Sequence, residues 1–291
     1  FDTKFSGKNI VMTVGAAGGL NVILKSLLNP ADEVIVFAPY FGEYRSYVSN
    51  YDGVLVEVSP DTETFQPKLA EFEEKITAKT KAVIVNNPNN PTGYLYSQQE
   101  LEQLRDIVLK HDLFLICDEV YREFCYDGAK HFSAMNLAGL EQNVIMIDSV
   151  SKRYSMCGVR LGTLASRNEE VLDAVLRMGQ ARLCPPYLAQ VAALAALDTP
   201  KSYFEEVHDE YMARRDCIVK ALNEIEGVYC PTPRGAFYSI VRLPVDDSER
   251  FARWLLEEFN DNGETVMFAP GAPMYATPGK GLDEVRMAYV L

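Results

Sequence analysis

The chain has 291 residues, of which 48% are hydrophobic and 24% are charged. This composition supports a packed core and excludes an intrinsically disordered protein. The 28 basic and 41 acidic residues give a formal net charge of −13 at pH 7. Because so acidic a surface repels phosphate backbones and anionic lipid headgroups, we expect neither nucleic acids nor membrane surfaces as partners.

The cysteines and histidines are scattered along the chain. The six cysteines contain no Cys-x-x-Cys pair, which favours reduced thiols and a reducing compartment such as the cytoplasm. The three histidines lie far apart and show no metal-ligand spacing, so we expect no metal site. The longest apolar runs are well short of the ~20 residues that cross a bilayer.

The two ends of the sequence indicate a piece of a longer chain. The first residue is Phe1 and not Met, and the apolar run Met287–Leu291 has nothing polar after it. Because whole domains seldom end on an apolar strand, we expect that the sequence continues in a longer protein.

Short apolar runs rich in β-branched residues alternate with amphipathic stretches in the first part of the chain. The stretch Ser97–His111, after an Asn-Pro-Thr-Gly turn, is the clearest helix. This alternation predicts an α/β domain with a mostly parallel sheet and helices on both faces. The predicted strands are Val34–Phe37, Val54–Val58, Ala82–Asn86, Leu113–Cys117, Val144–Asp148 and Leu161–Ala165.

A different order of elements follows from about residue 188 onward. Helices with antiparallel strands predict a smaller α+β domain, so we expect a large domain of residues 1–190 and a small domain of residues 191–291. The predicted elements are a long helical stretch from Leu188 through Tyr203–Glu224, a hairpin-like region at Val228–Leu243, a helix at Ser248–Asn262, and strands at Val266–Ala269 and Val285–Val290.

Ligands of an open α/β sheet gather at the carboxyl ends of its strands. The first such end leads from Val11 through Gly15, Ala16 and Ala17 into a helix of small residues. Small side chains let an anion approach the free N–H groups of the first helical turn, where the dipole also favours negative charge. A plain packing turn has the same composition, and this motif alone does not decide between the two.

Two further strand ends carry polar side chains. The segment Asn86–Gly93 has two Asn-Pro steps and a Gly, which predicts a rigid turn that presents amide side chains, Asn90 among them. Asp118 directly follows the apolar run Leu113–Cys117 and is followed by Tyr121. A carboxylate at the end of a buried strand needs a cationic partner or hydrogen bonds, and an ordinary helix N-cap is the alternative.

The fourth strand end carries a lysine among hydroxyl groups. Lys152 closes the run Ser149–Lys152, and Arg160 follows eight residues later. A lysine directly after a buried strand is poorly placed as a solubilising charge, although a surface lysine remains the alternative. It is well placed as an amine that loses its proton.

A phosphate cradle, an amide, a carboxylate and a lysine with a nearby arginine match the needs of pyridoxal phosphate, which enzymes hold as a Schiff base. The chain resembles the class I and II aminotransferases, fold-type-I pyridoxal-phosphate enzymes of the aspartate aminotransferase type. The resemblance covers nearly the whole chain and is most specific in Asn87–Gly93, Asp118–Tyr121 and Ser149–Lys152 with Arg160. It implies a seven-stranded sheet in the large domain.

The resemblance also implies a role for each candidate residue. Lys152 would form the Schiff base and move the proton at the substrate's Cα, with Asp118 and Tyr121 as the other catalytic residues. By themselves, Phe41 also suits a core position and Arg286 also suits a strand edge. The implied contacts are Asp118 with the pyridine nitrogen, Asn90 and Tyr121 with the phenolic oxygen, Phe41 with the ring face, Gly15, Ala16, Ala17, Ser149 and Arg160 with the phosphate, and Arg286 and Asn90 with the substrate.

By the same resemblance, the protein transfers an amino group from an L-amino acid to a 2-oxo acid by a ping-pong mechanism through Lys152. Aspartate is our first choice of donor and 2-oxoglutarate our first choice of acceptor. The family also implies a homodimer with a shared active site, an additional N-terminal segment and a C-terminal helix.

Two alternatives remain open. A carbon–sulfur β-lyase or an aminocyclopropane-carboxylate synthase uses the same cofactor, lysine, aspartate and arginines, and differs in how the reacting groups are positioned. A non-catalytic regulator would carry this fold beside a DNA-binding segment. The net charge of −13 and the lack of a basic helix in the sequence argue against the regulator.

Overall fold

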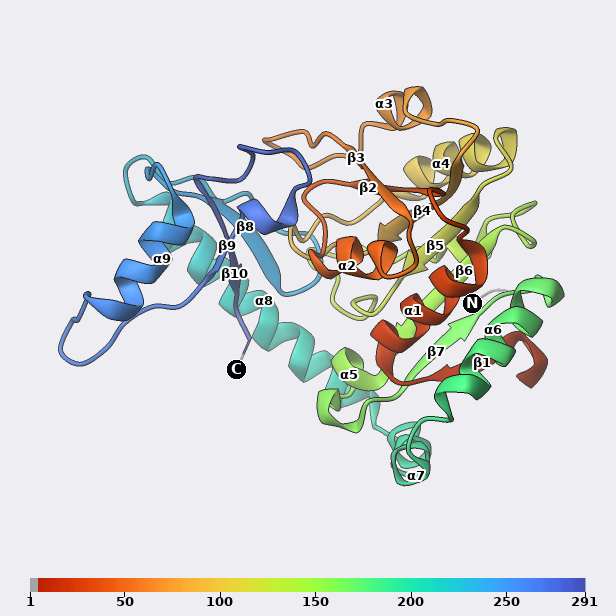
Figure 1. Ribbon diagram of the computed structural model, residues 1–291. Coiled ribbons are helices and arrows are strands. Elements are labelled where there is room, and N and C mark those ends of the chain that lie inside the picture. The colour runs from red at the N-terminus through yellow and green to blue at the C-terminus, as the bar shows by residue number, and fades with distance from the viewer. Residues whose placement is uncertain (1–4, 291) are drawn as a thin grey trace.

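The computed structural model describes residues 5–290, so Leu291 of the predicted terminal apolar run lies outside them. The main sheet has seven strands in the order β1-β7-β6-β5-β4-β2-β3 (Figure 1). Strands β3, β2, β4, β5 and β6 are parallel, and β7 is antiparallel to β6 and to β1. The predicted fold class is confirmed. The strands are β1 (Ile10–Thr13), β2 (Glu33–Phe37), β3 (Val54–Val58), β4 (Thr80–Asn86), β5 (Phe114–Asp118), β6 (Val144–Ser149) and β7 (Gly162–Ala165).

Helices cover both faces of this sheet because its strands are apolar on both sides. Successive side chains of a strand point to opposite faces. Val34 and Val36 therefore pack against one set of helices, and Ile35 packs against the other. The first set is α1 (Gly15–Leu27), α2 (Glu43–Ser49) and α6 (Glu169–Arg182); the second is α3 (Leu69–Glu74), α4 (Gln98–Lys110) and the short η2 (Ala134–Asn136).

Helix α4 illustrates how the local sequence sets an element. Ser97 accepts a hydrogen bond from the backbone N–H of Glu100, and the Glu100 side chain accepts one in return from the backbone of Ser97. This capping box begins the helix. Leu101, Leu104 and Val108 recur at helical spacing and are buried against the sheet. The predicted helix at 97–111 is confirmed, with both end residues as caps.

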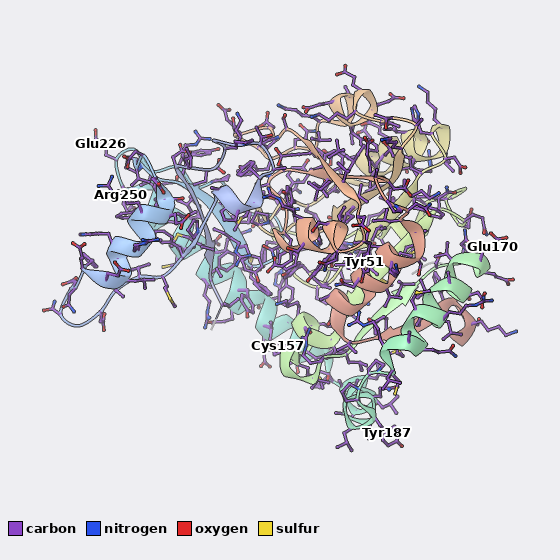
Figure 2. The ribbon with its side chains drawn as sticks, in the orientation of Figure 1. Tyr51, Cys157, Glu170, Tyr187, Glu226 and Arg250 are labelled. Atoms are coloured by element: carbon purple, nitrogen blue, oxygen red, sulfur yellow. The ribbon has the colours of Figure 1, made fainter. Side chains whose placement is uncertain are left out.

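The predicted long helical stretch is two helices separated at Pro200. Pro200 has no N–H and stands at the N-cap of α8 (Lys201–Asn223), after α7 (Tyr187–Ala196) has ended. Helix α8 begins beside α5 (Val150–Arg153) and runs toward the smaller sheet (Figure 1). Tyr187 of α7 projects at the edge of the molecule (Figure 2). No helix among residues 5–290 is both long and apolar enough to cross a membrane.

Three strands form the smaller sheet, in the antiparallel order β8-β10-β9. The hairpin-like region predicted at 228–243 is reduced to one antiparallel bridge between Tyr229 and Arg242, and β8 pairs instead with the distant β10. The predicted helix at 248–262 ends early, and the strand predicted at 266–269 shrinks to two residues. The elements are β8 (Tyr238–Arg242), α9 (Ser248–Glu257), β9 (Ala269–Pro270) and β10 (Glu284–Ala288); the short 3-10 helices are η1 (Gly7–Asn9), η3 (Cys157–Val159) and η4 (Ala272–Met274).

Candidate active site

The predicted site residues meet in one cavity of about 240 Å³. It lies at the carboxyl ends of the parallel strands, beside Asn86 of β4, Asp118 of β5 and Ser149 of β6. Gly15 packs against Arg160, and every other predicted site residue lines the cavity. The lining residues are Ala16, Ala17, Leu20, Phe41, Tyr47, Asn86, Asn90, Asp118, Val120, Tyr121, Ser149, Ser151, Lys152, Cys157, Arg160, Tyr238 and Arg286.

Asp118 is held at the bottom of the cavity by hydrogen bonds to its side chain. The Tyr44 hydroxyl donates to Oδ2 at 2.8 Å, and the Val120 N–H donates to Oδ1 at 3.4 Å. Burial raises the pKa of this carboxyl to about 6, and the hydrogen bonds from Tyr44 and Val120 lower it in part. Above that pH the carboxylate is ionised and can attract a cationic group inside the cavity.

A chain of hydrogen bonds connects the two sheets across the cavity. Arg286 Nη1 donates to Asn90 Oδ1 at 3.1 Å, and Asn90 Nδ2 donates to the Tyr121 hydroxyl at 3.3 Å. The Arg286 guanidinium also lies 4.8 Å from the ring centroid of Tyr238. Its other nitrogens make no hydrogen bond within residues 5–290, so they remain free to bind an anionic ligand.

The opposite end of the cavity is built for an anion. Helix α1 begins after Val14, which has no side chain that could cap the first N–H groups. Gly15 has a φ of 67°, and a Cβ there would lie 2.6 Å from Arg160 Nη2. A side chain at Gly15 would therefore push the guanidinium away from the helix terminus. The unpaired N–H groups and the arginine together favour a phosphate.

Lys152 projects from the short helix α5, whose N-cap is Ser149. Ser149 Oγ accepts from the Ser151 N–H at 3.1 Å and donates to the carbonyl of Leu161 at 3.0 Å. The Lys152 amine lies 5.8 Å from the ring centroid of Tyr121. It makes no ion pair or hydrogen bond with the described part of the chain, so it is available to react with a ligand.

Two tyrosines that form hydrogen bonds with predicted site residues were missed by the sequence analysis. Tyr44 bonds to Asp118, although 74 residues separate them, and the Tyr121 hydroxyl donates to the Tyr238 hydroxyl at 3.5 Å. Tyrosines are common in cores, and neither stands in a recognisable motif. Only Tyr44 offered a hint, through its three-residue spacing from Phe41. Phe41 precedes α2, Tyr44 lies in the first turn of α2, and their rings meet edge to face with centroids 5.5 Å apart.

Comparisons with known proteins agree with this arrangement. The family model for aminotransferase class I and II matches residues 2–262. A putative aminotransferase of Bacillus subtilis, YugH, is 35% identical, covering 99% of this chain and 73% of its own, and an aspartate aminotransferase of the same organism is 32% identical, over 98% and 72%. The solved structure of an alanine aminotransferase from Pyrococcus furiosus has a TM-score of 0.90 at 32% identity, over 99% and 73%.

The fold and the cavity thus define a pyridoxal-phosphate enzyme of fold type I. The chain belongs to the class I and II aminotransferases, and its cofactor is pyridoxal phosphate.

Proposed function

We propose that this enzyme transfers the amino group of L-aspartate to a 2-oxo acid, 2-oxoglutarate being the first candidate, by a ping-pong mechanism. The observation that carries the proposal is the meeting of the Lys152 amine, the Asp118 carboxylate and the Arg286 guanidinium around one cavity. The choice of aspartate is supported by relatives such as the B. subtilis aspartate aminotransferase.

The residues present fit the cofactor at both of its ends. The uncapped N-terminus of α1, with Ala16 and Ala17, would hold the phosphate together with Ser149 and Arg160. Gly15 keeps this space open, because any Cβ there would collide with Arg160.

At the ring end, Asp118 would pair with the protonated pyridine nitrogen, which offsets the cost of burying the carboxylate. Phe41 would pack on the ring face, and Asn90 and Tyr121 would bond the phenolic oxygen. When bound, pyridoxal phosphate supplies an aldehyde that takes up the amino group and a ring that withdraws electrons from the substrate's Cα.

The substrate would be oriented by Arg286 and deprotonated by Lys152. An arginine fork matches a carboxylate with two parallel hydrogen bonds, so Arg286 fixes which bonds of the amino acid face the Lys152 amine. Asn90 Oδ1 accepts a hydrogen bond from Arg286 Nη1 and so fixes the orientation of the guanidinium group. Lys152 Nζ would then act as a general base that takes the proton from the substrate's Cα. Later in the same half-reaction it would act as a general acid and donate that proton.

The test follows the visible absorption of the protein purified with pyridoxal phosphate. Addition of L-aspartate alone should remove the visible band and release oxaloacetate in at most one equivalent, because no acceptor is present. Addition of 2-oxoglutarate should restore the band and release glutamate. Lys152→Ala should abolish both changes, whereas Lys201→Ala, a substitution of an exposed lysine on α8, should leave them intact.

Other outcomes of the same test contradict parts of the proposal. If alanine or an aromatic amino acid removes the band and aspartate does not, the assigned donor is wrong. If cysteine derivatives yield pyruvate and a thiol without amino transfer, the enzyme is a β-lyase. If Lys152→Ala keeps the band and the activity, the assigned role of Lys152 is wrong.

We propose three further properties of the whole protein. The division into a large domain of residues 1–190 and a small domain of residues 191–291 is supported by the two separate sheets. A cytoplasmic location is supported by six cysteines that are all free. Assembly into a homodimer is supported by the exposed apolar side chains of α7.

A further inference from the structure

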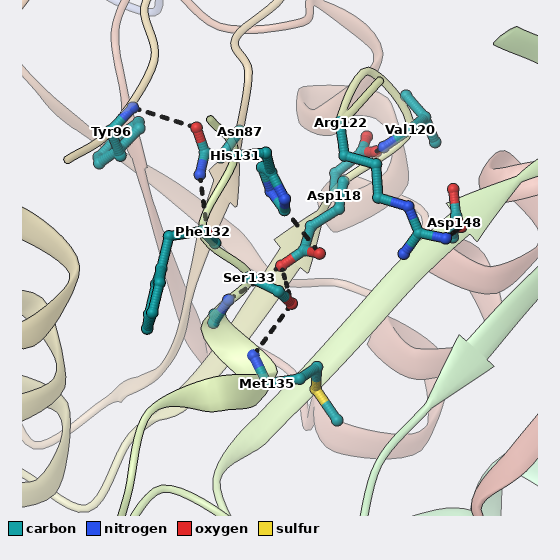
Figure 3. A network of polar contacts seen from close by, with 12 residues as sticks. Asn87, Tyr96, Asp118, Val120, Arg122, His131, Phe132, Ser133, Met135 and Asp148 are labelled. Atoms are coloured by element: carbon teal, nitrogen blue, oxygen red, sulfur yellow. Dashed lines mark hydrogen bonds and ion pairs between the residues drawn. The ribbon is translucent and has the colours of Figure 1, made fainter. Parts of the chain in front are cut away.

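Each of two residues of the site is followed directly by an arginine. Arg122 follows Tyr121, and Arg153 follows Lys152. Arg122 Nη2 lies 2.9 Å from Asp148 Oδ2, and Arg153 Nη2 donates to the same oxygen at 2.8 Å. Figure 3 shows Arg122 reaching Asp148 across the end of the sheet. One carboxylate oxygen is thus shared by two guanidinium groups.

Asp148 itself is anchored in the sheet. Its other oxygen, Oδ1, accepts the backbone N–H of Ser149 at 2.8 Å, and its side chain is 10% exposed. Glu123 supports the same pair of arginines from the solvent side, with its Oε1 3.0 Å from Arg153 Nε and 3.7 Å from Arg122 Nε. The ion pairs of Asp148 with the two arginines are therefore largely shielded from water. A charge interaction in such a shielded place is stronger than one at the surface.

The arginines connect two segments that the sheet does not connect. The pairing of strands β5 and β6 ends at Asp118 and Ile147. The last backbone hydrogen bond runs from the Glu119 N–H to the Ile147 carbonyl. Beyond that point, no backbone hydrogen bond joins residues 120–126 to residues 150–155 in the described part of the chain. The two segments carry Tyr121 and Lys152, whose side chains meet in the cavity.

We propose that Asp148 is a positioning residue that sets the separation of Tyr121 and Lys152 through Arg122 and Arg153. The inference rests on the proposed roles of Tyr121 and Lys152 in the reaction. With the carboxylate present, two like charges are drawn to one oxygen, and the segments that carry them are held together. Without its charge, only the more exposed Glu123 offsets the repulsion between the two arginines, and the segments move apart.

The test compares Asp148→Asn with Asp127→Asn as pyridoxal-phosphate holoenzymes. Asp127 also binds a buried arginine with two hydrogen bonds, from Arg215 at 2.7 and 2.9 Å, but it lies outside the cavity. Both substitutions turn an arginine-paired carboxylate into an amide; Asp127 is 53% exposed and Asp148 is 10% exposed. Asp148→Glu keeps the charge and serves as the conservative variant.

Three quantities distinguish positioning from a general loss of stability. In Asp148→Asn, we expect kcat to fall at least tenfold, with KM for the amino donor changed less than threefold because Arg286 is untouched. We also expect the pH midpoint of the visible absorption change to fall by at least half a unit, since the loss of one negative charge beside the two arginines disfavours a proton near Lys152. Asp127→Asn should change none of the three quantities, and Asp148→Glu should recover part of the kcat and part of the shift in the pH midpoint.

Equal kcat and equal pH midpoints in Asp148→Asn and Asp127→Asn would overturn the inference. If Asp148→Asn does not fold, Arg153→Gln tests the same contact, because it removes the charge that Asp148 attracts; a wild-type kcat there would also overturn the inference. The failure of the proposed function is separate: it would show as an unchanged band and activity in Lys152→Ala.

Discussion

At the scale of one residue, the Arg286 side chain is held in a fixed orientation beside the cavity. Asn90 occupies one of its terminal nitrogens, and Tyr238 packs against the guanidinium face at 4.8 Å. Both contacts restrict the rotation of the side chain, so the remaining edge is directed before a ligand arrives. A pre-oriented fork loses less conformational entropy when it binds a carboxylate.

We therefore expect Arg286→Lys to weaken substrate binding. A lysine keeps the charge but cannot form two parallel bonds, and the loss of one charged hydrogen bond of about 1.5–3 kcal/mol should lower kcat/KM by about tenfold to a hundredfold. Steady-state kinetics with the amino donor measures this effect. Arg242→Lys, on the neighbouring strand β8, is the matched control, and equal kinetics in the two variants would show that Arg286 does not bind the substrate.

At the scale of elements, a buried glutamate ties strand β5 to the 3-10 helix η2. Glu119 Oε1 accepts hydrogen bonds from the Ser133 hydroxyl at 2.8 Å and from the Ala134 N–H at 3.0 Å. Its Oε2 lies 3.7 Å from His131 Nε2, and neither atom has a hydrogen-bond partner among the described residues. His131 and Ser133 line the same network in Figure 3.

Burial raises the pKa of Glu119 to about 7 and lowers the pKa of His131 to about 4. Because the folded state binds the Glu119 proton more tightly than the unfolded state, Glu119 contributes stability that is fully present below pH 4.5. That contribution is lost as the pH rises toward 7.

Glu119→Gln should consequently stabilise the protein at pH 8. The amide oxygen keeps both hydrogen bonds, and the cost of an ionised buried carboxylate disappears, which we expect to add about 1–3 kcal/mol. At pH 5 the variant and the wild type should be nearly equal. Urea unfolding of the cofactor-free protein at the two pH values measures the difference. The exposed Glu226→Gln is the control, and a gain that is the same at pH 5 and pH 8 would contradict the assignment.

At the scale of the whole molecule, α7 carries a row of apolar side chains that residues 5–290 leave exposed. Leu188 is 80% exposed and Leu194 is 66% exposed, and Tyr187 projects away from the body of the molecule (Figure 2). Leu183 and Leu197 extend the same surface at either end of the helix. An apolar surface of this kind marks an interface with another protein, and a two-fold dimer would cover it with its own copy.

The proposed homodimer should have twice the 32.6 kDa mass of one chain in sedimentation or light scattering. The double variant Leu188→Asp and Leu194→Asp should shift the protein to the monomer, because two buried, unpaired carboxylates are too costly to retain at an interface. Leu256→Asp, which places a charge at an exposed leucine of α9, should leave the mass unchanged. A dimer that survives the double substitution would place the interface elsewhere.

Much of the fold and of the candidate site is already determined by the sequence. Apolar runs and their spacing predict the strands of the main sheet, and short motifs such as Asp118–Tyr121 and Ser149–Lys152 identify the strand ends where chemistry gathers. These features are local: each depends on a few neighbouring residues, and the physical rules that relate them to structure have a short range along the chain.

Only the tertiary structure decided the contacts between distant segments. Arg286 meets Asn90 across 196 residues, β8 pairs with β10 and not with its chain neighbour, and Asp148 collects arginines from two separate segments. Such pairings depend on how whole elements pack and on which register buries the most apolar surface. No short stretch of sequence contains that information, because the partners come together only when the chain is folded.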